Sequence, residues 1–479
     1  MDKMKILHVT PEASPFIKTG GLGDVAGSLP AALRERGHDV RCVLPEYGQI
    51  PGRYRGRLEH LLHFNTQVVW RDEYAGINRT VHNGVPFYFV DNKEKFYRDN
   101  LYDNPDRHVQ FTFFIRAVLE SLPKLDYKPD IIHCHDWQTA ILPLLLEDNY
   151  RQYDFYRDIK TVYTIHNLRY QGVFGSDIIA DTLGVDHGHW YSGKIRHDGL
   201  VNFMKAGINY ADRITTVSPS YASEIQTPEY GEGLDYALRM RGDDLAGIIN
   251  GIDYQEFDPG GDEEIYRHFD RERFNGKVTN KIKLQKDVGL PADKNIPLVG
   301  MVSRLVPQKG LDLLRGAGKK IKNLGMQLVV LGSGQPEYEN LLRDLSDEYP
   351  ENISAEIKYD FTLARRIYAG SDFFLMPSRF EPCGLGQMIS MRYGTIPIVR
   401  ETGGLKDTVI SWRKNKKQST GFTFSDYSSE AMVSALERAA ELSKNIEKLE
   451  KMQKRIMEED FSWLNSARSY EELYREVCK

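Results

Sequence analysis

One stretch decides how this chain folds: Lys18-Thr19-Gly20-Gly21-Leu22-Gly23-Asp24-Val25 follows an apolar run, Ile6–Thr10, and leads into an expected helix, Asp24–Arg36. A similar stretch, Thr402-Gly403-Gly404-Leu405-Lys406-Asp407-Thr408, follows the apolar run Ile396–Val399 in the second half of the chain. Glycines after a strand allow the tight turn that leads into a helix, so both stretches predict a strand–turn–helix unit. The repeat predicts two domains of similar topology.

Apolar runs alternate with helical patterns along the rest of the chain. The other expected strands are Val40–Leu44, Ile131–Cys134, Thr161–Ile165, Arg213–Val217, Leu298–Val302, Gln327–Leu331, Ile353–Ile357 and Phe373–Met376. Near-continuous apolar strands between helices are typical of parallel sheets covered on both faces. The exception is Leu58–Val90, where alternating residues around Asn83-Gly84 predict an antiparallel hairpin. We therefore expect an α/β protein of two doubly wound domains that face a central cleft.

The composition excludes several classes of protein. With 63 Lys and Arg against 68 Asp and Glu, the net charge of −5 gives no electrostatic reason to expect a nucleic-acid partner. Apolar runs such as Ile141–Leu146 are much shorter than the ~20 residues of a membrane helix, and the N-terminus turns polar too soon for a secretory signal. The scattered cysteines form no CxxC pattern, which disfavours a disulfide framework or a zinc site. We expect a large cytoplasmic enzyme with no membrane partner.

The loop Lys18–Gly23 has the composition of an anion site. Its glycines let backbone N–H groups approach an anion, the following helix adds partial positive charge, and Lys18 adds a full charge. The spacing is neither the GxGxxG of dinucleotide-binding proteins nor a P-loop. A plain tight turn is the alternative, and Lys18 favours anion binding. Thr402–Leu405 carries the same interpretation more weakly, because no lysine precedes it.

Two further loops follow expected strands of the second half. Arg304 and Lys309 lie on one loop, and two cations on one loop are suited to bind a diphosphate leaving group. Two ordinary surface cations are an equally good explanation. In Arg379–Gly386, Glu381 is suited to accept hydrogen bonds from sugar hydroxyls, and the N–H groups of Cys383–Leu385 face a phosphate. The alternative is a capping carboxylate before a glycine turn. The position between a strand and a helix favours a functional site.

Histidines end two expected strands of the first half. The pattern His133-x-His135 suggests a metal site, but zinc needs two further ligands, and His187 and His189 lie in a glycine-rich loop. We therefore expect no metal. Asp136 and His166, at the ends of adjacent strands, are interpreted as polar groups at the mouth of the cleft. Diphosphate- and sugar-binding loops without a metal cluster predict metal-independent glycosyl transfer from a nucleoside diphosphate sugar.

These motifs, in their order along the chain, resemble those of bacterial glycogen synthase and plant starch synthase. The segments that carry the resemblance are Lys18–Val25, His133–Thr139, Thr164–Asn167, Thr215–Tyr221, Gly247–Asp253, Arg304–Gly310, Pro377–Leu385 and Tyr393–Thr408. The resemblance implies a GT-B fold, with Rossmann-like domains at 1–249 and 250–459 and a C-terminal helix at 460–479 that packs back on the first. It implies a retaining glucosyltransferase that needs no cofactor and moves glucose from ADP-glucose to the non-reducing end of an α-1,4-glucan such as glycogen.

The resemblance also assigns roles to individual residues. Arg304 and Lys309 would bind the diphosphate and stabilise the departing ADP, while Glu381 would hold the glucose hydroxyls. His166 matches a histidine close to the transferred glucose, and Asp136 matches a residue on the acceptor side. The implied substrate-binding positions are Lys18, Gly20, Gly21, Asp24, Asn250, Tyr359, Cys383, Gly384, Leu385, Thr402, Gly403, Gly404 and Leu405.

One departure and three alternatives accompany this prediction. Many members of the family have threonine where this chain has Gly386, so a hydroxyl contact to phosphate is lost. Retention without a clear carboxylate nucleophile favours same-face substitution, in which the leaving phosphate takes the acceptor's proton. The alternatives are a UDP-glucose donor, a non-catalytic glucan- or nucleotide-sugar-binding protein, and an NAD-dependent dehydrogenase, which the lack of a GxGxxG unit disfavours.

Overall fold

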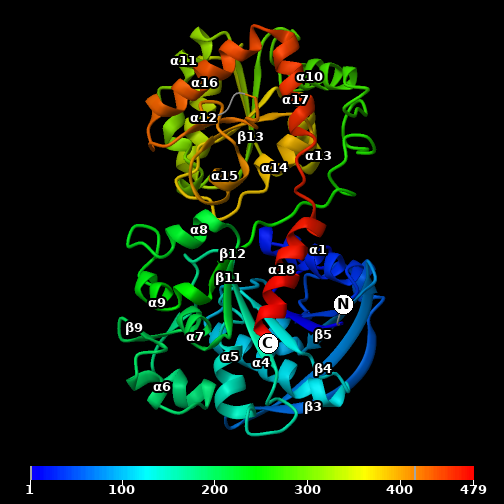
Figure 1. Cartoon of the computed structure of the whole chain (residues 1–479), viewed down its shortest axis with the longest axis vertical. Coiled ribbons are helices and arrows are strands. Elements are labelled where there is room, and N and C mark those ends of the chain that lie inside the picture. Colours follow the sequence, from blue (N-terminus) through cyan, green and yellow to red (C-terminus); the bar gives the residue numbers. More distant parts are fainter. Residues whose placement is uncertain (1–2, 415–416) are drawn as a thin grey trace. The chain divides into compact units, whose positions relative to one another are not determined.

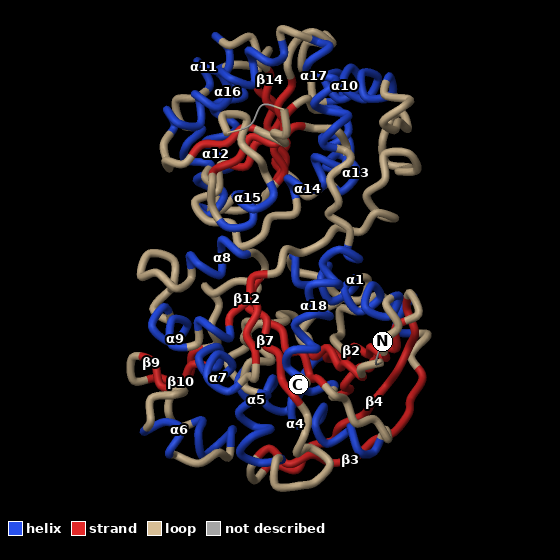
Figure 2. The backbone as a smooth tube through the Cα atoms, viewed as in Figure 1, coloured by secondary structure: helices blue, strands red, loops and turns tan. Residues whose placement is uncertain are grey.

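The chain forms two α/β units in the computed structural model, which describes residues 3–414 and 417–479 (Figure 1). The first unit comprises Met1–Gly251 and Trp463–Lys479, and the second comprises Ile252–Ser462. Each unit is built around its own main sheet, and helices lie on both faces of that sheet (Figure 2).

The main sheet of the first unit has nine strands in the order β12-β11-β7-β6-β1-β2-β5-β4-β3. Their bounds are β1 Lys5–Val9, β2 Asp39–Pro45, β3 Glu59–Val68, β4 Arg71–His82, β5 Val85–Asp91, β6 Ile131–His135, β7 Lys160–Ile165, β11 Arg213–Thr216 and β12 Leu245–Gly247. The strands from β12 to β5 are parallel, whereas β3 and β4 pair antiparallel. The central strands β6 and β7 are buried along almost their whole length, which explains their continuous apolar runs.

The other elements of the first unit surround this sheet. The helices are α1 Gly21–Glu35, α2 Gly52–Arg55, α3 Lys93–Phe96, α4 Arg107–Lys124, α5 Leu142–Leu145, α6 Gly188–Tyr191, α7 Phe203–Tyr210, α8 Pro219–Glu224, α9 Asp235–Met240 and α18 Trp463–Val477. A small antiparallel sheet contains β8 Val173–Phe174, β9 Arg196–His197 and β10 Leu200–Asn202. The last helix, α18, packs beside α1, and the two share an apolar core that includes Leu29, Trp463 and Tyr470 (Figure 1).

The second unit has a parallel sheet of six strands in the order β15-β14-β13-β16-β17-β18. The strands are β13 Leu298–Val302, β14 Gln327–Gly332, β15 Ile353–Ile357, β16 Phe373–Met376, β17 Ile396–Arg400 and β18 Phe422–Phe424. The helices are α10 Asn275–Asp287, α11 Gly318–Asn323, α12 Pro336–Glu348, α13 Phe361–Gly370, α14 Gly386–Arg392, α15 Gly403–Thr408, α16 Ser429–Ser443 and α17 Ile446–Ile456.

The expected strands and the antiparallel segment are confirmed. In the segment, His82 of β4 pairs with Val85 of β5, and both turn residues, Asn83 and Gly84, have positive φ, as a two-residue hairpin turn of this kind requires. The helical patterns of the sequence at 137–147 and 311–322 each predict one continuous helix, and both predictions are wrong in extent. At 137–147 the segment begins with turns, in which the Thr139 hydroxyl donates to the His135 carbonyl at 2.8 Å, and then forms α5, which continues as a π-helical turn over Leu146–Tyr150. The helix expected at 311–322 is interrupted next to Gly316, whose φ is +79°.

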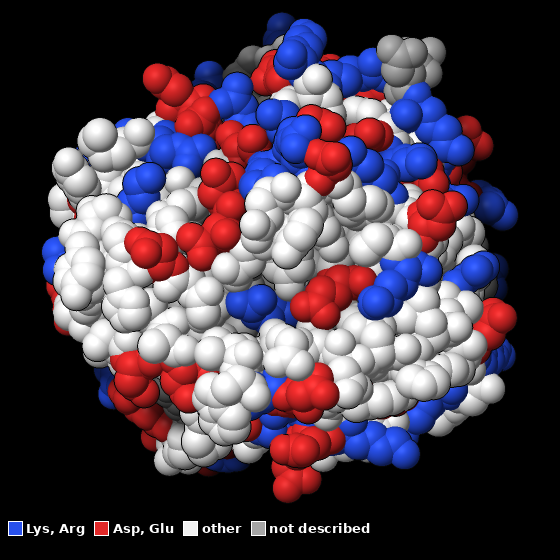
Figure 3. Space-filling model, turned by 90° about the horizontal axis from the view of Figure 1, so that it is seen from below, with Lys and Arg blue, Asp and Glu red and all other residues white. Residues whose placement is uncertain are grey.

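The surface is mixed in charge on the face that Figure 3 shows, where Lys and Arg are interspersed with Asp and Glu. Among the described residues, no helix combines the length and the apolar character that crossing a bilayer requires.

Candidate functional site

Many of the site residues expected from the sequence follow strands at or near the point where the strand order of each sheet reverses. In the first unit, β1 lies between β2 and β6, and in the second, β13 lies between β14 and β16. Open α/β sheets bind ligands beyond the carboxyl ends of strands at such switch points. Lys18, Asp136 and His166 follow β1, β6 and β7, and Lys309 and Glu381 follow β13 and β16. Each unit therefore brings its own candidates to one edge of its own sheet.

In the first unit the glycine loop is organised by a buried carboxylate, Glu12, which is only 2% exposed. Its oxygens accept the backbone N–H groups of Thr19 at 2.9 Å, Gly20 at 3.2 Å and Gly23 at 2.9 Å. They also accept the Tyr102 hydroxyl at 2.9 Å. Part of the anion-binding capacity expected of this loop is thus used inside the protein, and Glu12 fixes the loop's shape.

The outer side of the same loop carries its exposed groups. Lys18, Gly20 and Gly21 are exposed. The Lys18 ammonium is 2.6 Å from an Asp24 oxygen on α1, and about half of the lysine side chain is exposed. The ion pair holds Lys18 over the start of α1, beside the exposed loop, and Asp24 offsets the charge of the lysine there.

Asp136 and His166 are joined directly. The Asp136 carboxylate accepts the backbone N–H of His166 at 2.8 Å, so the ends of β6 and β7 are linked. Asp136 has a φ of +57°, an uncommon conformation for a residue other than glycine. Burial raises the pKa of its carboxyl to about 7, because the charged form loses hydration. At neutral pH a fraction of this carboxyl is therefore protonated.

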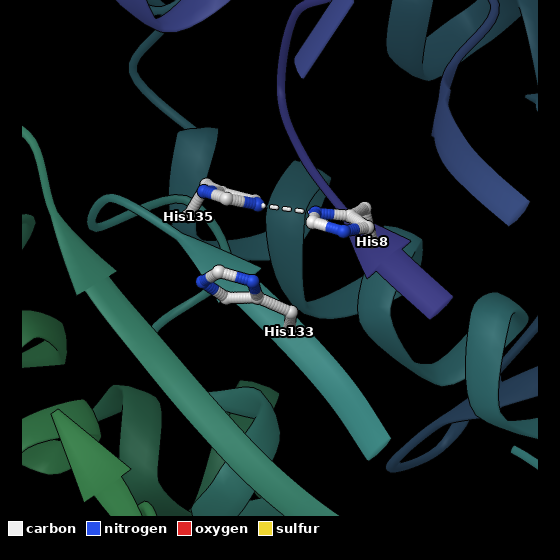
Figure 4. A group of neighbouring side chains, drawn as sticks. All are labelled: His8, His133 and His135. Atoms are coloured by element: carbon white, nitrogen blue, oxygen red, sulfur yellow. Dashed lines mark hydrogen bonds between the residues drawn. The ribbon is translucent and has the colours of Figure 1, made fainter. Parts of the chain in front are cut away.

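A cluster of buried histidines lies behind His166. The ring nitrogens of His8, His133 and His135 come within 4.8 Å of one another, which is close enough to suggest a metal site (Figure 4). Figure 4 shows a hydrogen bond between His8 and His135, and the two nitrogens are 3.0 Å apart. His133 bonds Thr164 at 2.6 Å and Tyr474 of α18 at 2.7 Å.

The hydrogen bonds of these three rings decide between a metal and a polar network. The remaining nitrogen of His135 bonds His166 at 3.0 Å, so five of the six ring nitrogens already have protein partners. Only Nε2 of His8 lacks a partner among the described residues. A metal needs a lone pair from each ligand, and these lone pairs and protons are committed to hydrogen bonds. The absence of a metal remains a prediction, and the geometry is that of a hydrogen-bonded network.

Asn250, the remaining candidate of the first unit, follows β12. Its side chain is 5% exposed, and its Oδ1 has no hydrogen-bond partner among the described residues. The neighbouring Ile249 carbonyl accepts the Ser466 hydroxyl of α18 at 2.7 Å. A buried amide oxygen without a partner is costly unless a ligand or water supplies a donor.

In the second unit, Lys309 and Glu381 meet across two loops. The lysine Nζ lies 2.6 Å from Oε2 of Glu381, which also accepts the Ser378 hydroxyl at 3.0 Å. The glutamate side chain is 8% exposed and the lysine side chain 17%. Arg304 is exposed on the same loop as Lys309 and makes no ion pair with any residue in 3–414 or 417–479. This edge therefore holds one paired cation and one available cation.

The glycine turns of the second unit pack against the Glu381 loop. The Gly404 N–H donates to the carbonyl of Glu381 at 3.2 Å. A Cβ added at Gly403, whose φ is +43°, would lie 2.0 Å from that carbonyl oxygen. Gln387 donates its amide to the Cys383 and Gly384 carbonyls at 3.1 and 2.8 Å. Thr402–Leu405 thus supports the segment that carries Glu381. The fold brings this glycine turn and the Glu381 segment together in one site.

Two other positions have distinct surroundings. Tyr359, beyond the end of β15, is 90% exposed, so one aromatic face is available to a ligand. At Gly386, an added Cβ would lie 2.9 Å from a ring carbon of Phe374 on β16. The phenylalanine ring therefore occupies part of the room that a threonine at this position would require.

Sequence reasoning missed three residues of the first-unit site: Glu12, His8 and His135 in its hydrogen-bonding role. His8 carried a signal, because a histidine inside an apolar strand needs hydrogen-bond partners. Glu12 carried a weaker one, a carboxylate within a short chain distance of a glycine loop that offers free N–H groups. Neither the partner nor the direction of these bonds can be read from the sequence.

Comparisons with known proteins agree along the whole chain. Residues 5–240 match the family model of the starch synthase catalytic domain, and residues 282–458 match glycosyl transferases group 1. A glycogen synthase of Exiguobacterium sibiricum is 48% identical over 479 residues and covers 99% of both chains. A glycogen synthase of Clostridioides difficile is 46% identical over 479 residues, which is 99% of this chain and 100% of the relative.

A solved structure supports the same assignment. The catalytic domain of starch synthase IV from Arabidopsis thaliana, bound to ADP and acarbose, matches with a TM-score of 0.90 and 36% identity over 100% of both chains. The two-domain α/β architecture with parallel sheets is that of GT-B glycosyltransferases. This chain therefore belongs to the glycogen and starch synthase family of glycosyltransferases.

Proposed function

We propose that this glycosyltransferase moves glucose from ADP-glucose to the non-reducing end of an α-1,4-glucan such as glycogen, with retention of configuration and without a metal. The observation that carries the proposal is the Lys309–Glu381 pair at the switch point of the second sheet, with the exposed Arg304 beside it. The ADP in the related starch synthase structure supports an adenine nucleotide as the leaving group. The free cysteines support a reducing compartment, and we propose the cytoplasm.

The second unit would bind the donor. Arg304 and Lys309 would neutralise the diphosphate, whose negative charge grows as the glycosidic bond breaks. Glu381, held by Lys309 and Ser378, would accept hydrogen bonds from the glucose hydroxyls. Tyr359 would pack its exposed ring on the base. The segments that would complete the phosphate and sugar contacts are Cys383, Gly384 and Leu385 with Thr402, Gly403, Gly404 and Leu405.

The first unit would bind the acceptor. Lys18 and the exposed glycines Gly20 and Gly21 would approach the phosphates or the acceptor, with Asp24 supporting the loop. Asp136 and His166 would contact the sugars at the reacting bond. Asn250 would donate or accept a hydrogen bond through its buried amide.

The proposed chemistry is a same-face substitution. The bond between C1 of glucose and the β-phosphate oxygen breaks, the acceptor O4 attacks C1 from the same face, and its proton goes to the leaving phosphate oxygen. A covalent glycosyl-enzyme would need a free carboxylate nucleophile. Glu381 is engaged by Lys309, and burial raises the pKa of Asp136 to about 7, so neither carboxylate is well suited to that role.

One experiment tests donor, activity and stereochemistry together. The protein is incubated with glycogen and either ADP-glucose or UDP-glucose, and released nucleotide is measured with and without EDTA. We expect ADP release, little UDP release and no effect of EDTA, with an α-linked product by proton NMR. Preferential UDP release would overturn the donor assignment, and no release from either donor would favour a binding protein.

A further inference from the structure

Three histidines of the first unit form a continuous chain of hydrogen bonds that ends at the site. His8 Nδ1 is 3.0 Å from His135 Nε2, and His135 Nδ1 is 3.0 Å from His166 Nε2. The three residues come from β1, the end of β6 and the residue after β7, which are neighbouring strands. His8 and His135 are fully buried, and His166 is 9% exposed. The chain therefore runs from the interior to the ligand edge of the sheet.

The ring geometry fits hydrogen bonding between imidazoles. The His8 and His135 ring centres are 5.3 Å apart and their planes differ by 12°, as expected when an N–H of one ring points at a nitrogen of the other in a common plane. The His135 and His166 rings are also 5.3 Å apart, with a tilt of 39°. Burial lowers the pKa of His8 and His166 to about 3 and that of His135 well below its usual value. All three rings are therefore neutral at pH 7.

Neutral rings in such a chain must share one tautomer. Each neutral imidazole has one N–H and one bare nitrogen, so a ring that donates through one nitrogen must accept through the other. Two arrangements keep both bonds: all three protons on Nδ1, or all three on Nε2. Any mixture leaves two protons or two bare nitrogens facing each other at 3.0 Å. The tautomer of His166 is therefore coupled to that of His8.

The buried end of the chain selects between the two arrangements. Nε2 of His8 is buried and has no partner among the described residues. A buried N–H without an acceptor is rarer in proteins than an unpaired acceptor, which favours a bare Nε2 and a proton on Nδ1. The same direction then places a proton on Nδ1 of His166. That atom makes no hydrogen bond within residues 3–414 and 417–479 and is not enclosed in the interior.

We propose that His8 and His135 are positioning residues that hold His166 as an Nδ1–H donor, aimed at an oxygen of the transferred glucosyl group or of the leaving phosphate. The inference rests on the proposed function for the identity of that oxygen, but the tautomer itself does not depend on it. His166 is the residue that touches substrate. His135 fixes its proton and its ring orientation, and His8 sets the direction of the chain.

The tautomer is tested directly by nitrogen-15 NMR of the full-length protein labelled at histidine. Bare and protonated ring nitrogens have widely separated chemical shifts. The signals are assigned from spectra of variants in which one histidine at a time is replaced. We expect His8, His135 and His166 to be neutral at pH 7 with the proton on Nδ1 in each ring. A proton on Nε2 in any of the three, or a charged ring, would overturn the proposal.

The positioning role is tested by two variants of equal size, His135→Asn and His135→Leu. The asparagine amide reaches the place of Nδ1 and can donate to His166, whereas leucine cannot. We expect His135→Leu to lower kcat at least about tenfold with a smaller change in donor KM, and His135→Asn to retain most of kcat. Equal losses in both variants, at equal folding by circular dichroism, would refute the role of His135.

A third variant separates this role from general destabilisation. His133 lies on the same strand as His135 and is equally buried. Its nitrogens bond Thr164 and Tyr474, which do not belong to the hydrogen-bond chain of His8, His135 and His166. His133→Gln is expected to lower the unfolding temperature and to leave the tautomer signals of the three rings unchanged. If the wild-type protein releases no nucleotide from either donor, the proposed function fails, and the NMR result still decides the hydrogen-bond chain.

Discussion

At the scale of single residues, the Lys309–Glu381 pair should contribute both to donor binding and to the stability of the folded protein. Lys309→Ala removes a cation 2.6 Å from a glutamate whose side chain is 8% exposed. We expect turnover to fall by about 10²–10³-fold, because the charge that develops on the leaving phosphate is no longer neutralised. Nucleotide affinity should fall less. Nucleotide release assays and equilibrium binding of ADP measure the two effects.

Two controls isolate the catalytic effect of Lys309. Lys320→Ala removes an exposed lysine of the same unit and should change neither quantity. A buried carboxylate without its partner costs about 3–5 kcal/mol, so Lys309→Ala should also unfold more easily. In the double variant Lys309→Ala/Glu381→Gln the unpaired charge is gone. It should regain stability without regaining turnover, and equal losses of turnover and ADP affinity in Lys309→Ala would contradict the assignment.

Glu12 is the residue that shapes the glycine loop. In Glu12→Gln, one acceptor oxygen remains, but an NH₂ group replaces the other and faces the loop N–H groups that the carboxylate now accepts. We expect a loss of about 1–3 kcal/mol in stability and faster amide hydrogen exchange across residues 18–23. Glu35→Gln, at an exposed position at the end of helix α1, should leave both unchanged. Unaltered exchange in Glu12→Gln would mean that the loop holds its shape without this carboxylate.

At the scale of elements, the parallel strands were predictable and the short irregular pieces were not. A strand buried on both faces must be apolar along its length, so runs such as Thr161–Ile165 can be recognised as strands from the sequence. The hairpin turn was readable for a similar reason, because Asn83-Gly84 suits a turn with two positive φ angles. The small sheet of β8, β9 and β10 has strands of two or three residues, which are too short to show an alternation of apolar and polar residues.

The same contrast holds for the site. Loops that follow strands at a switch point are placed by topology, which is why Lys309 and Glu381 could be expected at one edge. Their 2.6 Å ion pair could not, because it depends on side-chain packing between loops that are about 70 residues apart. The contacts of Glu12 and His135 were missed for the same reason.

The close approach of α15 to the Glu381 loop gives an element-scale prediction. Gly403→Ala places a Cβ 2.0 Å from the Glu381 carbonyl at a φ of +43°, so the segment that carries Glu381 must move. We expect kcat to fall more than about tenfold, since small displacements of a catalytic group are costly. Gly325→Ala is the control, because its φ is +64° and no atom lies within 4 Å of the added Cβ. It should cost only about 1–3 kcal/mol of backbone strain, without loss of kcat in the folded protein.

At the scale of the whole molecule, titratable groups are divided unequally between the two units. His268 is the only histidine of the second unit, and the other histidines belong to the first. Burial lowers the pKa of several of these, most strongly His8, His133, His135 and His166. In the second unit the comparable group is Lys277, whose pKa burial lowers to about 7. The units should therefore respond differently to mild acid.

We expect acidification from pH 7 to 5.5 to destabilise the first unit selectively. An imidazole with a lowered folded-state pKa contributes its full stability above the unfolded pKa of 6.5, and the contribution is lost as the pH falls toward the folded value. For a folded pKa of about 3, as for His8 and His166, the loss over this interval is about 1 kcal/mol per histidine. Asp136 acts in the opposite direction, because its raised pKa favours the folded state as the pH falls. Several histidines outweigh this one carboxyl.

Amide hydrogen exchange read by mass spectrometry measures this difference, with labelling times adjusted for the pH dependence of intrinsic exchange. Protection should fall at pH 5.5 in strands β1, β6 and β7, while β13, β14 and β16 keep theirs. The second unit serves as the internal control, because Lys277, whose folded-state pKa is about 7, completes its protonation just below pH 7 and adds little further pH dependence toward pH 5.5. Loss of protection in the second unit first would show that acid lability comes from groups other than the buried histidines.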